Sequence, residues 1–260
     1  MRKRIGGWIV VIVAGLAMPP SILAQQPGAA RGIPDLSGVW GRPAVTSGSG
    51  IFADDANGTP FLGFTKDAPP LQPAAMEKYR ANRQGVSEAR ARGRDNRDPL
   101  AFCYPPGPTR IFTEPRQFEI RQIPEMVYIL SEIDHVVRRI YTDGEKIEGY
   151  PPTWHGYSVG RYDGNTLVAD TVEIEEQTWI DGLGTPHSDA LHLVERFRRV
   201  NRNTLEIEFT FDDPKTFTKA WGGKKVFQVQ PPATEVKEHV LCEEFRKAGL
   251  RKSGYEFFRE

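Results

Sequence analysis

Two carboxylates stand in stretches that are otherwise apolar and strand-like. Asp170 lies in a predicted strand over 166–174, and Glu195 lies in a predicted strand over 190–200. Alternate residues of a strand share one face, so each carboxylate is expected on a face that otherwise carries Val or Leu side chains. Burial there costs on the order of several kcal/mol unless the carboxylate is paired. Each is therefore either an acid–base group with a raised pKa in an apolar cavity, or a carboxylate bonded to backbone amides or to an arginine such as Arg138, Arg139 or Arg161.

His187 and Asp189 form a second candidate for acid–base chemistry. On a strand the two side chains would share a face, and in a loop they would crowd together at its mouth. A histidine oriented by a carboxylate is a general base near neutral pH. The alternative is a turn with capping side chains. His135 begins another predicted strand; it is a further acid–base candidate if it faces the interior with His187, and a packed strand residue if it does not.

Aromatic residues indicate where a ligand could be held. Trp154, Tyr157 and Trp179 are candidate ligand contacts, because their rings could stack on a planar or sugar-like molecule, and Arg139 is a candidate polar contact. The alternative is that the rings belong to the core. The spacing of the histidines and cysteines follows none of the common metal motifs, and no phosphate-binding glycine loop follows a strand, so neither a metal nor a cofactor is expected.

The pattern of the chain predicts many short strands. They fall within 117–142, 157–200, 204–211 and 217–230, and the third of these alternates apolar and polar residues throughout. Asp163-Gly164-Asn165 predicts a tight hairpin, since Gly and Asn tolerate a positive φ. About eight to ten strands without alternating helices predict an all-β fold, an antiparallel β-barrel of the lipocalin type. The irregular segment 46–73 and a basic helix over 74–92 are expected to wrap it.

The N-terminus predicts export. Three basic residues precede an apolar run over 8–18, two prolines end the run, and residues 22–24 suit signal-peptidase cleavage after Ala24. We therefore expect a signal peptide over 1–24, a flexible leader over 25–34 and a single β-barrel domain over 35–260, in the periplasm or secreted. In such a compartment Cys103 and Cys242, the two cysteines of the chain, are expected to form a disulfide. The alternative is two separate buried thiols.

The charge of the exported chain is nearly balanced. Without the signal peptide it carries 31 basic and 34 acidic residues, a net charge of −3. Such a balance provides no broad basic surface, so a nucleic-acid partner is not expected. No later segment is long and apolar enough to predict an integral membrane helix.

Several local patterns form a recognisable set. They are 34–40 (PDLSGVW), 105–110 next to Cys103, 133–143 (IDHVVRRIYTD), 158–171 (SVGRYDGNTLVADT) and 187–198 (HSDALHLVERFR). Together they resemble a group of exported bacterial proteins common in soil acidobacteria, a resemblance that covers most of the exported chain and implies no particular reaction. Gly38-Val39-Trp40 is also similar to the G-x-W start of lipocalins and related calycin barrels. That similarity implies that Trp40 plugs the closed end of a barrel.

The sequence supports three functions. The first is a lipocalin-like barrel that binds a small organic molecule in a partly polar lumen, with Asp170, Glu195 and the arginines as an internal network. The alternative is a cofactor-independent enzyme, an isomerase, hydro-lyase or hydrolase, in which His187 and Asp189 move a proton. The third is a structural envelope protein whose basic helix contacts a partner. Convergence of the acid–base residues in an open cavity would favour the enzyme, whereas arginine-paired carboxylates around a filled lumen would favour the other two.

Overall fold

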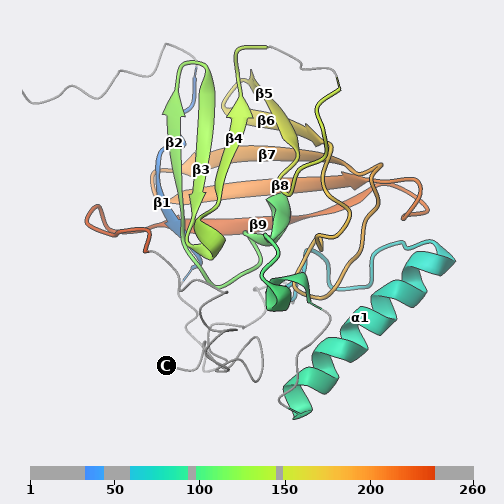
Figure 1. Cartoon of the computed structure of the whole chain (residues 1–260). Coiled ribbons are helices and arrows are strands. Elements are labelled where there is room, and N and C mark those ends of the chain that lie inside the picture. The colour runs from blue at the N-terminus through green and yellow to red at the C-terminus, as the bar shows by residue number, and fades with distance from the viewer. Residues whose placement is uncertain (1–32, 44–58, 93–97, 145–148, 238–260) are drawn as a thin grey trace, which may run out of the picture.

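The computed structural model describes residues 33–43, 59–92, 98–144 and 149–237 (Figure 1). Within these ranges nine strands form a closed barrel in chain order, and β9 pairs with β1. The strands are β1 (Gly38–Gly41), β2 (Phe118–Ile123), β3 (Met126–Ser131), β4 (Val137–Tyr141), β5 (Tyr157–Asp163), β6 (Thr166–Val172), β7 (His192–Asn201), β8 (Thr204–Asp212) and β9 (Trp221–Val229). The predicted all-β barrel is confirmed.

Helices lie only in the connections between the described strands. They are α1 (Pro73–Arg92), α2 (Gly107–Arg110) and two short 3₁₀ helices, Pro99–Phe102 and Ile133–His135. The predicted basic helix over 74–92 is α1, and Pro73 opens it, a position where the fixed φ of proline suits the first turn. No helix in the described ranges has the length and apolar character needed to cross a membrane.

One pair of neighbouring strands departs from the predicted antiparallel order. β4 and β5 run parallel, with Ile140 beside Ser158 and Tyr141 beside Val159, while all other neighbours are antiparallel. Parallel neighbours need a connection long enough to return the chain to the same end of the sheet. Residues 142–156 provide that length. The barrel is therefore mixed, although mostly antiparallel.

The hairpin between β5 and β6 is the predicted one. Asp163 pairs with Thr166, so Gly164 and Asn165 form a two-residue loop. Gly164 has a φ of 58°, in the region that favours glycine. The turn residues therefore fix the register of this hairpin.

Protein side chains fill the middle of the barrel. Phe112, which follows α2, lies with its ring centroid 5.1 Å from that of Phe118 on β2, 6.2 Å from Phe197 on β7, 5.5 Å from Phe209 on β8 and 5.9 Å from Phe227 on β9. All five rings are buried. A residue from outside the sheet thus occupies the space between four strands, and at this level the predicted lumen is filled by the protein itself.

β6 presents the opposite face to the interior from the one predicted. Leu167 and Ala169 belong to the hydrophobic core, whereas the side chain of Asp170 is 35% exposed and Val172 is exposed. The prediction that Asp170 faces the interior is therefore wrong. Both faces of β6 carry apolar residues near its centre, so the alternation of hydrophobic residues does not distinguish them.

β7 and β1 have the expected buried residues. Leu193, Glu195 and Phe197 are fully buried on the inner face of β7. Trp40 on β1 is also fully buried; its indole N–H donates to the carbonyl of Leu36 at 3.0 Å, and the guanidinium of Arg199 lies 5.1 Å from its ring centroid. The relation of Trp40 to the calycin G-x-W start stays a prediction.

Residues 59–72 pack against β8 and β9. The ring of Phe64 lies 4.6 Å from that of Phe209, and the Lys225 ammonium donates to the carbonyls of Pro60 at 3.3 Å and Phe61 at 2.9 Å. A Cβ at Gly223 would come within 2.2 Å of the Phe64 carbonyl oxygen, so only glycine allows this close approach. The segment therefore has a fixed path before α1 begins.

A buried ionic network fixes the segment that carries α2. Arg110 donates to both carboxylate oxygens of Asp98 and, through Nε, to Glu114 Oε1 at 3.1 Å. All three side chains are buried, and burial raises the pKa of Glu114. Since Phe112 lies between Arg110 and Glu114, this network holds the ring that fills the barrel.

Candidate functional site

A buried ion pair lies inside the barrel between β4 and β7. Arg138 donates through Nη1 to Glu195 Oε1 at 2.8 Å and through Nη2 to Glu195 Oε2. Nη2 also donates to the hydroxyls of Ser158 at 3.1 Å and Thr171 at 3.0 Å. Neither charged side chain reaches solvent. Glu195 thus has the internal arginine partner that one of its two predicted alternatives required, and both of its oxygens accept hydrogen bonds.

His155, which precedes β5, is affected by the charge of Arg138. Burial lowers the pKa of His155 to about 4, with a second contribution from the positive charge of Arg138 and an opposing one from a hydrogen bond to the backbone of Gly107. Its Nδ1 is buried and, like Arg138 Nε, has no hydrogen-bond partner among the described residues. The imidazole is therefore neutral at pH 7.

The depressed pKa of His155 predicts a pH-dependent loss of stability. The unfolded chain binds a proton near pH 6.5 and the folded chain does not, so stability is fully present above pH 6.5 and falls as the pH drops toward 4. Between pH 7.5 and 4.5 the wild type should lose about 2–3 kcal/mol more than His155→Gln. Urea unfolding of both proteins at the two pH values measures this difference. An equal loss in both would contradict the assignment.

Asp170 and Glu195 do not come together. Asp170, on the outer face of β6, forms an ion pair with Arg161 and lies with Oδ1 3.1 Å from His192 Nε2. Glu195 lies on the inner face of the neighbouring strand. The sheet itself separates the two carboxylates, so no acid–base pair forms between them in this structure.

His187 is held by two neighbours in the loop between β6 and β7. Its Nδ1 lies 2.9 Å from the Ser188 carbonyl oxygen, which only accepts hydrogen bonds, so Nδ1 carries the proton. Nε2 lies 2.7 Å from the hydroxyl oxygen of Thr178, whose one proton is shared between this nitrogen and the Glu175 carbonyl oxygen at 3.1 Å. The side chain is buried, and burial lowers its pKa.

Asp189 is paired with a lysine and not with this histidine. It accepts from the Lys215 ammonium at 2.7 Å, and this hydrogen bond lowers the pKa of Asp189. Both side chains of the pair are exposed. Asp213 instead accepts from the backbone N–H of Ser188 at 2.7 Å and from its hydroxyl at 2.8 Å. Side chains thus cap backbone groups of this segment, as in the turn alternative, but the capping carboxylate is Asp213 and not Asp189.

The aromatic candidates occupy separate places. Trp154 lies against Tyr104 with ring centroids 5.2 Å apart. Tyr157 is buried between two rings, Tyr141 at 5.2 Å and Tyr150 at 4.8 Å. The two groups of rings have no member in common, so each candidate contacts its own neighbours.

The remaining candidates are also spread over the molecule. Trp179 is buried below the guanidinium of Arg110, whose Cζ lies 5.5 Å from the ring centroid. Arg139 lies on the exposed face of β4. His135 ends a 3₁₀ helix, and its side chain is outside what the structure describes. No three His, Cys, Asp or Glu side chains in the described ranges are grouped to hold a metal ion.

Several predictions fall outside the described residues. The signal peptide over 1–24, most of the leader over 25–34 and Cys242 belong to the ranges that the structure does not describe. The Cys103–Cys242 disulfide therefore stays a prediction. Cys103 itself follows the 3₁₀ helix Pro99–Phe102 with a φ of 66°.

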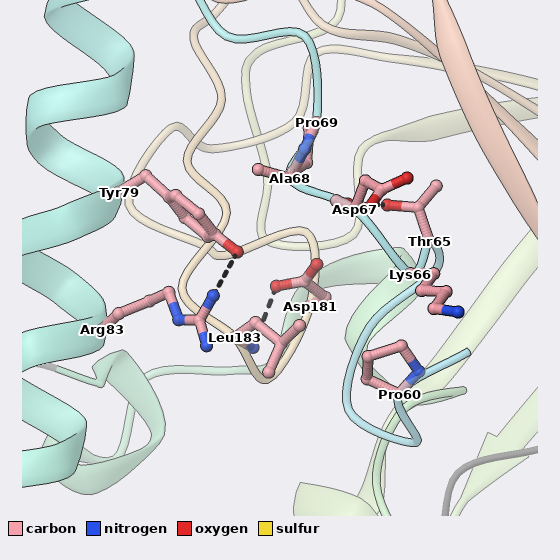
Figure 2. Close-up of a pocket in the computed structure, with 10 residues that line it drawn as sticks. All are labelled: Pro60, Thr65, Lys66, Asp67, Ala68, Pro69, Tyr79, Arg83, Asp181 and Leu183. Atoms are coloured by element: carbon pink, nitrogen blue, oxygen red, sulfur yellow. Dashed lines mark hydrogen bonds between the residues drawn. The ribbon is translucent and has the colours of Figure 1, made fainter. Parts of the chain in front are cut away.

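A pocket of about 190 Å³ lies between α1, residues 59–70 and the loop that joins β6 to β7 (Figure 2). Apolar side chains form much of its wall, and charged groups and one tyrosine hydroxyl lie among them. The lining residues are Pro60, Thr65, Lys66, Asp67, Ala68, Pro69, Tyr79, Arg83, Asp181 and Leu183. A cavity of about 150 Å³ holds a benzene molecule. The pocket therefore has room for a molecule of roughly one substituted ring.

Tyr79 and Arg83 project from the same face of α1 into this pocket (Figure 2). Arg83 Nη1 donates to the Tyr79 hydroxyl oxygen at 3.3 Å. Tyr79 is 4% exposed, and no described residue accepts the proton of its hydroxyl. Burial, followed by the negative charge of Asp181, raises the pKa of Tyr79, so the hydroxyl is protonated and is a donor at neutral pH.

Asp181 forms the buried part of the pocket wall. Its Oδ1 accepts from the backbone N–H groups of Leu183 at 2.9 Å and Thr185 at 3.1 Å, and its Oδ2 accepts from the Thr185 hydroxyl at 2.8 Å. Burial raises its pKa. The loop therefore uses this carboxylate to hold its own backbone, and Asn82 of α1 anchors the same loop by donating to the Gly184 carbonyl at 2.9 Å.

Sequence analysis did not identify Tyr79, Arg83 or Asp181. Tyr79 and Arg83 are four residues apart, which places them on one face of a helix, and that spacing was the available signal. No sequence pattern indicated Asp181, because the groups that bind its carboxylate belong to its own irregular loop. The sequence identifies the helix only as basic and does not distinguish Arg83, which lines the pocket, from Arg80, which does not.

Comparison with known proteins assigns no family: no protein-family model matches the chain, and no curated protein matches it. The geometry of the pocket and of the buried groups is therefore what bears on function.

Proposed function

We propose that this protein is an exported β-barrel that binds a small organic molecule in the pocket between α1 and the loops beside the barrel. The proposal keeps the binding function that the sequence favours and moves it out of the lumen, where Phe112 occupies the space between four strands. Export rests on the N-terminal signal pattern alone.

The observation that carries the proposal is a concave site with partly apolar walls and a buried donor that has no acceptor among the described residues. Ligand sites combine apolar walls with a few placed polar groups. Here Pro60, Pro69 and Leu183 supply apolar wall, and the Tyr79 hydroxyl supplies a buried O–H whose proton goes to no described residue. A buried donor without an acceptor costs about 1–3 kcal/mol, which a bound ligand would recover.

The enzyme alternative has less support. It needs His187, Asp170 and Glu195 to converge, and each of the three has its own partner: Thr178, Arg161 and Arg138 respectively. The structural alternative draws on exposed basic residues of α1, such as Lys78 and Arg80. Neither alternative accounts for the pocket.

Filling the pocket tests the proposal. Ala68 is exposed at its rim, so Ala68→Phe should leave the fold intact while occupying the site. We expect the wild type to bind a single-ring probe (benzoate, benzamide or benzylamine) and the variant to bind it at least about tenfold more weakly, a difference of 1.4 kcal/mol. Isothermal titration calorimetry measures both affinities.

A matched control separates pocket filling from an added surface ring. Ala74→Phe places the same side chain at an exposed position of α1 that does not line the pocket, and it should bind like the wild type. Absence of binding of all three probes at millimolar concentration, or equal binding by Ala68→Phe and the wild type, would refute the proposed function.

A further inference from the structure

We infer that the molecule held in this pocket is a carboxylate on a ring-sized apolar body, and that Tyr79 and Arg83 bind its anionic group. This inference rests on the binding function proposed above and adds the chemical class of the ligand.

Three polar residues of the pocket, Lys66, Tyr79 and Arg83, carry N–H or O–H groups that no described residue accepts. A guanidinium has five N–H groups, and the Tyr79 hydroxyl accepts one of those of Arg83. The proton of that hydroxyl goes to no described residue. Within the described residues, no carboxylate lies within ion-pair distance of Arg83 or of Lys66 at the rim. A ligand rich in acceptors would satisfy these groups.

The geometry suits a carboxylate in particular. Tyr79 and Arg83 lie one helical turn apart, and Figure 2 shows the hydroxyl and the guanidinium directed together toward the loop of Asp181 and Leu183. The planar guanidinium offers parallel N–H groups that match the two oxygens of a carboxylate. Its Cζ lies 5.6 Å from the centroid of the Tyr79 ring, so the buried ring supports the position of the guanidinium.

Two carboxylates of the protein, Asp67 and Asp181, also line the pocket, and they favour a cationic ligand. Asp181 is buried, accepts three hydrogen bonds from its own loop and has a raised pKa, which reduces its ability to hold a cation. Asp67 is exposed at the rim. The buried group with an unused hydrogen-bonding capacity is Tyr79, whose hydroxyl proton has no acceptor among the described residues, and this decides in favour of an anion. An ammonium ligand is the alternative that the experiment has to exclude.

Apolar residues opposite the donors define the body of the ligand. Pro60, Ala68, Pro69 and Leu183 complete the wall of a pocket of about 190 Å³. That space takes one ring with a small substituent and leaves no room for a second ring.

The test compares three probes that share a ring and differ in charge: benzoate, benzamide and benzylamine. By calorimetry the wild type should bind benzoate at least about tenfold more tightly than either of the others. Arg83→Gln should weaken benzoate about tenfold and leave benzamide unchanged, and Tyr79→Phe should weaken benzoate by a smaller factor. Arg80→Gln, which removes the same charge from an exposed position of α1 outside the pocket, should leave all three affinities unchanged.

Each other outcome counts against the inference. Equal binding of benzamide and benzoate, or tighter binding of benzylamine, would overturn the carboxylate assignment and leave the binding function intact. Equal weakening by Arg83→Gln and Arg80→Gln would replace the specific contact with a general effect of charge, and would also overturn it. Binding of none of the probes would overturn both this inference and the proposed function.

Discussion

Glu195→Ala is expected to lower the free energy of unfolding by about 3–5 kcal/mol. The substitution leaves the Arg138 guanidinium inside the barrel without its counter-charge. Its remaining partners, the hydroxyls of Ser158 and Thr171 and the carbonyl of Pro108, are neutral. A buried charge that loses its partner keeps the full cost of its removal from water. Urea unfolding followed by tryptophan fluorescence measures the loss.

Two further variants show that the effect belongs to the buried pair. Glu206→Ala removes a carboxylate from a surface network with Arg198 and Lys224, and should cost about 0–1 kcal/mol. The double variant Arg138→Met, Glu195→Leu removes both buried charges together and should recover most of the loss, since apolar replacement of a buried pair is often neutral. A loss below about 1 kcal/mol for Glu195→Ala would mean that water reaches the pair.

Phe112→Ala is expected to destabilise the protein by about 3–5 kcal/mol. The ring contacts four other rings from four strands, and its removal leaves a cavity in the centre of the barrel that the surrounding strands, closed on themselves, have little freedom to fill. The same unfolding measurement detects it. We expect this loss of stability even though Phe112 belongs to no strand, because its ring is part of the barrel core.

The matched control is Phe102→Ala, ten positions earlier in the same segment. Phe102 is 43% exposed, so its truncation should change the stability by less than about 0.5 kcal/mol. Similar small losses for both variants would contradict the conclusion that Phe112 fills the interior, and would favour an open lumen of the kind predicted from the sequence.

The fold was predictable where local patterns are unambiguous. Leu205, Ile207 and Phe209 alternate with polar residues and define the inner face of β8 without reference to the rest of the chain. Gly164 fixes a hairpin by its backbone conformation alone. The face of β6 was not predictable in this way, because Leu167 and Val168 are both apolar and both buried.

The candidate site was predictable only in part, because it depends on distant contacts. The cost of burying a carboxylate predicted that Glu195 has a partner, and it has one. Which arginine that is depends on which strands face each other across a closed barrel. Arg138 is 57 residues away, so no local pattern indicates it. For His187 and Asp189 the two-residue spacing was taken as a strand spacing, yet β7 begins only at His192. The rule of alternate faces therefore did not apply to them.

The pocket was missed because three separate segments form it. Ala68, Tyr79 and Leu183 come from the segment before α1, from α1 and from the loop between β6 and β7. No single stretch of sequence carries that juxtaposition. The three segments are brought together by tertiary contacts such as the hydrogen bond from Asn82 of α1 to the Gly184 carbonyl of the loop.

A crystal structure of the protein grown with benzoate shows where the ligand binds. We expect the ring of the probe beside Pro69 and Leu183, with its carboxylate on the Tyr79 hydroxyl and the Arg83 guanidinium. Density for the probe inside the barrel next to Phe112, with the pocket at α1 empty, would contradict it.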